Sequence, residues 1–149
     1  MQPVFRWVRV RVMCYATEDR DRIAEVFRTF IGTDEWNEDV VEGEMGNITV
    51  IMDAEITRQK DIDGIFVRLG DETVDRISSE LEDRTDEDCT FYVRLDKQKA
   101  FSGTYSVATG GDVISLTCKI ASYPARRELA VDILRHYLSS LPRSAPEPL

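Results

Sequence analysis

One short run gathers several side chains that can recognise a charged polymer. The sequence Arg-Leu-Asp-Lys-Gln-Lys-Ala-Phe supplies three cations, Arg94, Lys97 and Lys99, at the end of an alternating pattern. Cations make salt-dependent contacts with phosphates, the amide of Gln98 can hydrogen-bond a sugar or a base edge, and the ring of Phe101 can stack on a base. The same run also fits an ordinary turn whose phenylalanine fills the core. Composition alone therefore leaves nucleic-acid binding and a structural turn both open.

The sequence carries none of the short motifs that mark common enzyme active sites. It has no GxxxxGKS or GxxxxGKT loop, no GxGxxG turn, no HExxH pair and no GxSxG elbow. Its one histidine, His136, falls beside a helical apolar stripe, and three widely spaced cysteines fit buried free thiols better than a zinc site. We therefore expect no enzyme activity, no cofactor and no metal site. A metal-dependent nuclease that uses carboxylates alone is the remaining catalytic alternative.

The charge of the chain is strongly uneven along its length. The 149 residues carry a formal net charge of −9, yet residues 1–87 hold 22 acids and 11 bases, whereas residues 88–149 hold 6 acids and 8 bases. A negative molecule repels phosphates in general, so any anion-binding face must be a confined patch that draws on the second half. No stretch approaches the roughly 20 apolar residues of a membrane-spanning helix, and no signal-peptide pattern opens the chain. We expect a cytoplasmic protein.

Two periodicities divide the chain into strands and helices. Alternation of apolar and polar residues predicts strands at residues 6–15, 40–41, 48–56, 91–95, 103–107 and 114–121. A spacing of three and four predicts helices that begin after Thr17 and end at Gly32, cover 62–69 and 74–85, and run from Pro124 to Leu141. In the first strand the apolar residues share one face, so Arg9 and Arg11 point away from the core.

The order and the one-faced character of the strands define the fold class. Strands with one apolar face are typical of antiparallel sheets that are covered on a single side. We therefore predict an α+β, two-layer sandwich with a mostly antiparallel sheet and helices on one face. One domain is expected over residues 4–141, followed by a disordered tail at 142–149. The uncovered face of the sheet must then meet water, a partner or a ligand.

Four short motifs, spread in order along the chain, carry a family resemblance. They are Ala-Thr-Glu-Asp at 16–19, Glu-Gly with Gly-Asn at 42–47, Leu-Asp-Lys-Gln-Lys-Ala at 95–100 and Ala-Ser-Tyr-Pro-Ala at 121–125. Over about residues 6–140 the chain resembles an archaeal RNA-binding family whose members are described as predicted exosome subunits. The resemblance implies a small α+β RNA-binding domain, either like a double-stranded-RNA-binding domain or like the 5S-rRNA-binding ribosomal proteins. We favour the second version, because the expected element order exceeds an α-β-β-β-α domain.

These observations lead to one hypothesis with one alternative. We expect a non-catalytic RNA-binding protein, exosome-associated or ribosome-related, whose RNA contacts are Arg94, Lys97, Gln98, Lys99, Lys119, Arg9, Arg11, Arg126 and Arg127. The two residues at the start of the last helix are included because helix N-termini favour phosphate. The alternative is a protein-interaction or self-associating module, such as a homodimer, without direct RNA contact. The strand at 48–56 is the candidate edge for such self-pairing.

Overall fold

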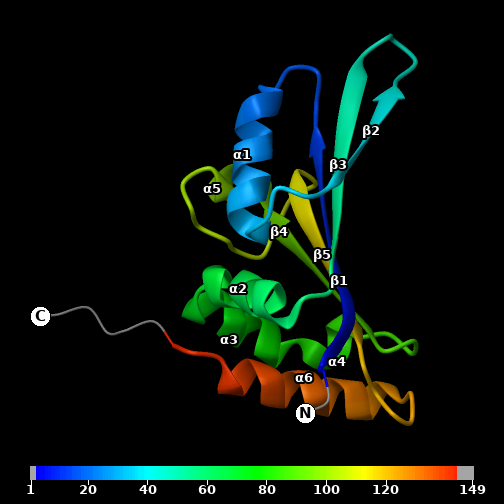
Figure 1. The fold of residues 1–149 in the computed structure, drawn as a ribbon, viewed down its shortest axis with the longest axis vertical. Helices are drawn as coiled ribbons and strands as arrows, with labels where there is room; N and C mark the ends of the chain where they lie inside the picture. The colour runs from blue at the N-terminus through cyan, green and yellow to red at the C-terminus, as the bar shows by residue number, and fades with distance from the viewer. Residues whose placement is uncertain (1–2, 144–149) are drawn as a thin grey trace, which may run out of the picture.

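A computed structural model describes residues 3–143 of the chain, and five antiparallel strands form its centre (Figure 1). In the sheet the strands lie in the order β2-β3-β1-β5-β4. Each neighbouring pair is antiparallel. The strands are β1 (Phe5–Cys14), β2 (Asn37–Glu42), β3 (Ile48–Ile56), β4 (Thr90–Asp96) and β5 (Val113–Ile120). The first strand of the sequence therefore lies in the centre of the sheet.

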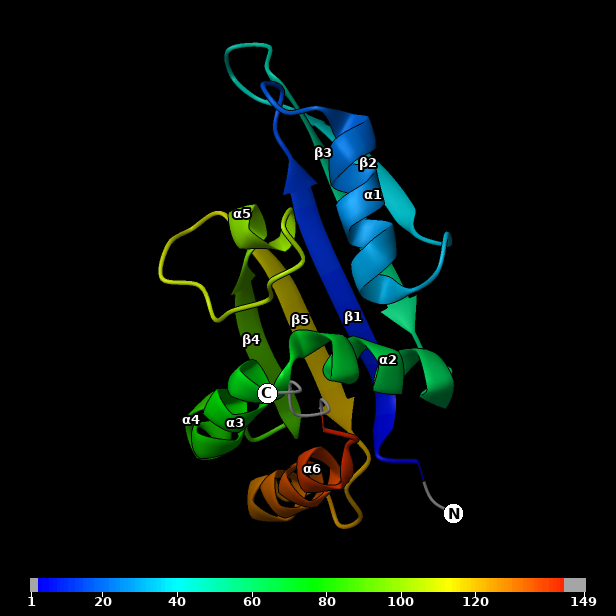
Figure 2. The same cartoon turned by 90° about the vertical axis from the view of Figure 1, so that its left-hand side faces the viewer.

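The helices all lie on one side of this sheet. They are α1 (Arg20–Ile31), α2 (Gln59–Leu69), α3 (Asp71–Ser79), α4 (Leu81–Arg84), α5 (Lys97–Ala100) and α6 (Arg127–Ser140). The two ribbon views together show α1 and α2 in front of the sheet and α6 across its lower end (Figures 1 and 2). The predicted class, α+β with an antiparallel sheet covered on one face, is confirmed. The opposite face carries no helix of the described chain, and we call it the open face.

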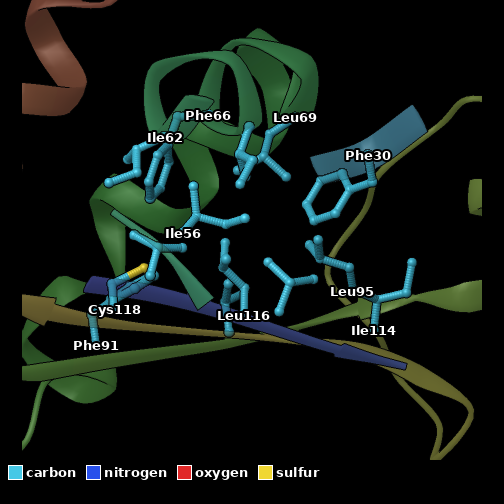
Figure 3. Close-up of a cluster of buried hydrophobic side chains, with 14 of the residues drawn as sticks. Phe30, Ile56, Ile62, Phe66, Leu69, Phe91, Leu95, Ile114, Leu116 and Cys118 are labelled. Carbon is cyan, nitrogen blue, oxygen red and sulfur yellow. The ribbon is translucent and has the colours of Figure 1, made fainter. Parts of the chain in front are cut away.

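The hydrophobic core fills the space between the sheet and the helices (Figure 3). Side chains of alternate strand residues, such as Leu95 and Leu116, meet Phe30 of α1 and Phe66 of α2. Period-two alternation puts every second side chain of β1 into this core, and all three cysteines are buried and free. Each buried apolar side chain of this size contributes about 1.5–3 kcal/mol relative to exposure. The strength of the alternation explains why four of the strands could be located from sequence.

Several local predictions need correction. The first helix is capped by Asp19, whose carboxylate accepts from the backbone of Asp21 at 3.0 Å, and Thr17 is not its cap. Residues 103–107 form no strand, because Val107 makes only an isolated bridge with Leu95. The expected helix over 74–85 is divided into α3 and α4. The candidate edge at 48–56 is β3, which lies between β2 and β1 and is therefore not an edge.

The two ends of the described chain lie near the same end of the sheet. Arg143 forms an ion pair with Asp75 of α3, at 2.8 Å.

The predicted disordered tail at 142–149 falls, from residue 144 onward, outside the described residues. Within residues 3–143, no helix is both long enough and apolar enough to cross a membrane.

Candidate nucleic-acid interface

The open face of β1, β5 and β4 carries cations at regular positions across neighbouring strands. The strand register places Arg11 opposite Ser115 of β5, and Ser115 opposite Arg94 of β4. One step along the strands, Arg9 stands opposite Thr117, which in turn stands opposite Tyr92. Neighbouring strands are about 4.8 Å apart. The register therefore produces rows in which a hydroxyl lies between two larger side chains.

A third row of the open face adds an aromatic ring and a fourth cation. Trp7 of β1 stands opposite Lys119 of β5, and Lys119 stands opposite Thr90 of β4. The guanidinium of Arg9 lies 5.0 Å from the centre of the Trp7 ring, a cation-π arrangement. The Lys119 ammonium donates to the backbone carbonyl of Asp88. We call Trp7, Arg9, Arg11, Tyr92, Arg94 and Lys119 the cationic face.

Acidic residues of β3 border the cationic face and hold two of its arginines. Arg11 donates to one oxygen of Asp53 at 2.7 and 3.0 Å, and Arg9 pairs with Glu55 at 3.3 Å. The side chain of Arg9 remains 45% exposed and that of Arg11 50% exposed. Exposed ion pairs of this kind contribute about 0–1 kcal/mol, so a phosphate can compete for them. Arg94 is exposed and has no ion-pair partner among residues 3–143.

Two exposed aromatic residues belong to the same region. Tyr92 donates its hydroxyl to Asp86 at 3.1 Å, and partial burial together with this bond raises the pKa of Tyr92. At the lower end of the sheet, a bulge between Phe5 and Trp7 coincides with an outward-facing Arg6, whose guanidinium donates to the hydroxyl of the exposed Tyr123 at 2.7 Å. The alternation at residues 91–95 places Tyr92 outward with Arg94, but the sequence prediction included none of these aromatic residues among the RNA contacts. The same alternation at residues 6–15 would have placed Trp7 outward with Arg9 and Arg11.

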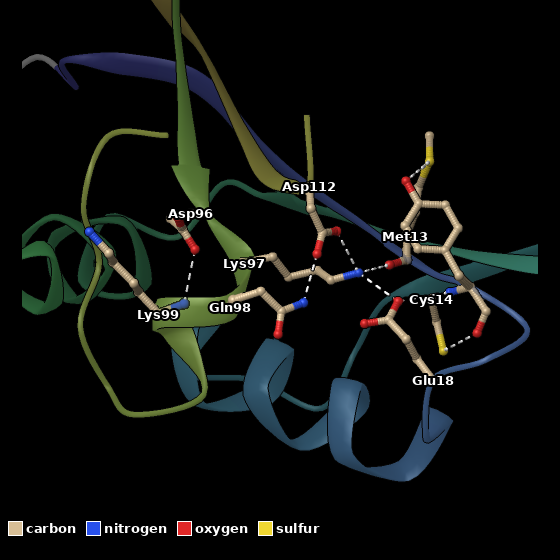
Figure 4. A network of polar contacts seen from close by, with 9 residues as sticks. Met13, Cys14, Glu18, Asp96, Lys97, Gln98, Lys99 and Asp112 are labelled. Atoms are coloured by element: carbon tan, nitrogen blue, oxygen red, sulfur yellow. Dashed lines mark hydrogen bonds and ion pairs between the residues drawn. The ribbon is translucent and has the colours of Figure 1, made fainter. Parts of the chain in front are cut away.

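Lys97 lies in a buried ionic network and not on an interface (Figure 4). Its side chain is 1% exposed, and its ammonium contacts Glu18 at 2.7 Å, Asp112 at 2.9 Å and the backbone carbonyl of Met13 at 2.8 Å. Burial opposes the charged form, but the hydrogen bonds to the two carboxylates outweigh it and raise the pKa of Lys97. Its expected position near phosphates therefore needs correction, because three acceptors already surround the ammonium.

The other residues of the 94–101 run also serve local structure. Gln98 donates its amide to Asp112 at 2.7 Å, and Asp96 caps α5 by accepting from the backbone of Lys99 at 3.0 Å. Phe101 packs against the core, with the Arg22 guanidinium 4.7 Å from its ring centre. The side chain of Lys99 lines a cavity of about 550 Å³ that also involves α2 and α3, on the helical side.

The two arginines at the start of α6 differ in their surroundings. Arg126 is exposed at the N-cap position, where it makes no side-chain cap bond. Arg127 donates to the backbone carbonyls of Thr85, at 2.7 Å, and of Glu82, and so ties α6 to the end of α4. Of the nine predicted contact residues, the structure brings four together on the open face: Arg9, Arg11, Arg94 and Lys119.

A further cavity lies away from the cationic face. It has a volume of about 1050 Å³ and lies between α2 and α6, with His136 and Tyr137 in its wall. Tyr137 donates to Asp63 at 2.5 Å, and burial raises the pKa of Tyr137, with Asp63 adding to the effect. Among residues 3–143, no group of three metal-ligating side chains converges, in this cavity or outside it. The wall of the cavity is mainly apolar, and it includes the hydrogen-bonded pair of Tyr137 and Asp63.

Comparison with known proteins identifies the family. A family model described as RNA binding matches residues 7–120, from Trp7 at one end to Ile120 at the other. The chain belongs to this RNA-binding family. The matched segment includes the whole cationic face, because Lys119 lies one residue inside its end.

Individual relatives agree with membership of the RNA-binding family. The RNA-binding protein PAB1135 of Pyrococcus abyssi is 32% identical over 141 residues, which cover 88% of this chain and 92% of the relative. Among solved structures, Mth689, a DUF54 protein from Methanothermobacter thermautotrophicus, is 30% identical with a TM-score of 0.77, covering 91% of this chain and 99% of that one. AF2318 from Archaeglobus fulgidus, also a DUF54 protein, is 32% identical with a TM-score of 0.76, covering 89% and 98%.

Proposed function

We propose that this protein binds RNA on the cationic face of its sheet. The observation that carries the proposal is the register, which brings four cations and two aromatic rings onto three neighbouring strands of an uncovered face. Membership of the RNA-binding family supports the same ligand. Because Lys97 is buried and Arg127 is bonded to the backbone, neither contributes to the proposed interface.

The composition of the cationic face favours unpaired RNA. Trp7 and Tyr92 offer ring faces on which unstacked bases can stack, at about 1–3 kcal/mol per base. Ser115 and Thr117 lie within the rows of the open face, between the larger side chains of β1 and β4, where their hydroxyls can bond sugars. Arg94 is the phosphate contact least restrained by the protein. An exposed sheet face of this kind suits single strands or loops, because the bases of a regular duplex are stacked and cannot stack on its rings.

The net charge determines how strong this binding can be. With a net charge of −9, most of the surface repels phosphates, and only the cationic face attracts them. We therefore expect moderate affinity that falls steeply with salt concentration. The acidic border formed by Asp53 and Glu55 limits the footprint on the β3 side of the face.

We assign the protein a non-catalytic role in the cytoplasm. The resemblance to predicted exosome subunits supports a place as an accessory factor in RNA processing or degradation, and the ribosomal-protein-like version of the resemblance supports a ribosome-related place. The second candidate function is that of a protein-interaction module. The exposed acidic strand β2 favours it, and this strand is considered below.

The test is a titration of labelled unstructured RNA and hairpin RNA, followed by fluorescence anisotropy at several salt concentrations. The variant Arg94→Ala/Lys119→Ala should weaken binding to the unstructured RNA by about tenfold, and the slope of log affinity against log salt should fall by roughly 0.7 for each lost contact.

A matched control variant removes the same charge from the helical side. Lys60→Ala/Arg76→Ala changes two cations of α2 and α3, both of which are exposed. It should bind RNA with an affinity within about twofold of the unmodified protein, since it touches no part of the cationic face. Equal weakening in the two double variants would mean that overall charge, and not the cationic face, controls binding. An unchanged affinity in Arg94→Ala/Lys119→Ala would reject the interface.

A further inference from the structure

The strand β2 is uncovered on both of its faces. All six of its residues are exposed, whereas the other four strands each bury one face. Together with the start of β3 it forms a hairpin that projects beyond the end of α1 (Figure 1). The hairpin exposes large apolar side chains, at 67% for Val40, 47% for Val41, 88% for Met45 and 50% for Ile48. Exposed apolar side chains gathered in this way are typical of interaction sites.

The outer edge of β2 also presents unpaired backbone. In the described sheet β2 is the terminal strand and pairs only with β3. A terminal strand leaves alternate N-H and C=O groups free to pair with a further strand. Natural proteins commonly protect such edges with charged side chains, with proline or with a covering segment. The charged residues of β2 are all acids, Glu38, Asp39 and Glu42, so they oppose an acidic strand but not a basic one.

The charge of the hairpin has a single sign. Residues 37–51 contain the acids Glu38, Asp39, Glu42 and Glu44 and no base. Glu38 is engaged, because it accepts from Trp36 at 3.1 Å and pairs with Arg20. The other three acids have no ion-pair partner within residues 3–143. An occupant of this edge must therefore bring positive charge.

The base of the hairpin is held firmly, so that the edge is presented in one conformation. Trp36 packs edge-on against Phe27 of α1 at 5.3 Å, and the Arg28 guanidinium lies 5.5 Å from the Trp36 ring. At the tip, Gly43 donates to the carbonyl of Asn47 at 2.8 Å, and Gly46 has a φ of 78°. A preformed edge lowers the entropic cost of adding a strand.

A second copy of this chain is a poor occupant. An antiparallel pair of β2 strands centred between Val40 and Val41 places Asp39 opposite Glu42 twice. Moving the centre to Val40 places Glu38 opposite Glu42 twice instead, and in every register two β2 strands bring together six acids and no base. Like charges directly opposite one another destabilise a strand pair. RNA is excluded for the same electrostatic reason.

We propose that β2 accepts an extended, basic and apolar segment of a partner protein as a sixth strand. Backbone hydrogen bonds would supply affinity, and the side chains would supply specificity. Opposite Val40 and Val41 the partner places apolar residues, one on each face of the sheet. Opposite Glu38, Asp39 and Glu42 it places lysine or arginine. This site is separate from the cationic face and does not depend on the proposed RNA binding.

The partner chemistry can be tested with a designed peptide. The sequence Lys-Val-Val-Lys-Lys-Thr, laid antiparallel to residues 42–37, matches every acid with a lysine and every valine with a valine. Titration into the isotope-labelled protein, followed by amide chemical shifts, should perturb residues 37–42 and their β3 neighbours. A control peptide of the same sequence, N-methylated at every backbone amide, keeps the charge but cannot donate the backbone hydrogen bonds of a strand on either edge. It should leave the shifts of 37–42 unchanged.

Two protein variants with equal charge change complete the test. Val41→Lys alters the edge, whereas Val67→Lys alters an equally exposed valine of α2, at 44%. Val41→Lys should weaken peptide binding by about two- to fivefold, the scale of one cross-strand pair, and Val67→Lys should not. Perturbations that lie outside the hairpin, or equal effects of the two peptides or of the two variants, would overturn the proposal. Because the titration contains no RNA, its failure would leave the RNA-binding proposal untouched.

Discussion

Arg94 and Lys97 are cations three residues apart in one run, yet the structure gives them opposite surroundings. Arg94 ends exposed on the open face, next to Ser115 of β5 and without an ion-pair partner in the described chain. Lys97 turns into α5, where the carboxylates of Glu18 and Asp112 surround its ammonium. A charged residue with satisfied, buried partners is committed to the fold, and an exposed one without partners is available to a ligand. The same residue class therefore belongs to the fold at one position and to the proposed RNA interface at the other.

The largest effect that this comparison predicts is the loss of Lys97. Lys97→Met leaves Glu18 and Asp112 partly buried without their shared cation, so the free energy of unfolding should fall by about 3–5 kcal/mol. Urea unfolding followed by circular dichroism measures it.

A neighbouring lysine provides the control for this measurement. Lys99→Met changes an exposed residue with no side-chain partner within residues 3–143, and it should alter stability by less than about 0.5 kcal/mol. Similar urea midpoints for the two variants would show that the buried network contributes little. If folded Lys97→Met also bound RNA less well than Lys99→Met, the separation between fold and function would be wrong.

The acid side of the same network predicts a smaller, pH-dependent effect. Burial opposes ionisation of Asp112, but hydrogen bonds from Gln98 and Lys97 outweigh it and lower the pKa of Asp112. A lowered pKa contributes stability at pH values above the ordinary aspartate pKa of about 3.9. This contribution is lost as the pH falls through the folded-state pKa of Asp112. Because the carboxylate is partly exposed, Asp112→Asn should cost only about 1 kcal/mol at neutral pH.

Unfolding curves across the acid range test this prediction. The stabilities of the unmodified protein and of Asp112→Asn should differ at neutral pH, begin to converge below about pH 4, and meet only below the lowered folded-state pKa of Asp112, where the aspartate is protonated in both states. A difference that stays constant down to the lowest pH would mean that Asp112 acts by shape and not by charge.

At alkaline pH the dependence of stability on pH has the opposite sign. The raised pKa of Lys97 contributes stability at neutral pH that is lost as the pH rises through the folded-state value.

The strands could be predicted from sequence, but their neighbours could not. Alternation fixes which side chains of β1 and β5 face the core, because a strand repeats every two residues. It contains no information on which strands pair. The prediction therefore treated β3 as an edge, although β2 covers its outer side. The error at the first helix is local, since Thr17 and Asp19 are both good caps two residues apart.

The candidate site was predictable only where it follows the alternation. Arg9, Arg11, Arg94 and Lys119 share the outward phase of their strands, and so they reach one face. The burial of Lys97 was not predictable, because its partners Glu18 and Asp112 lie far away in the sequence and meet it only through the sheet pairing. Charged residues near chain turns are usually exposed, which is the rule that misled the prediction.

The smallest predicted effect sharpens the comparison on the open face itself. Asp53 pairs with Arg11 at 2.7 Å and more weakly with Arg9 at 3.7 Å, so Asp53→Asn should release Arg11 to RNA and loosen Arg9, which keeps its pair with Glu55. Because such exposed pairs contribute about 0–1 kcal/mol, RNA binding should become tighter by roughly two- to fivefold, measured by anisotropy at low salt. The control Glu25→Gln removes an equal charge from an exposed position of α1, on the helical side of the sheet. If both variants tightened binding equally, the gain would come from net charge alone. If Asp53→Asn bound no more tightly than the unmodified protein, the two arginines would be structural, like Lys97, and the interface would shrink toward Arg94 and Lys119.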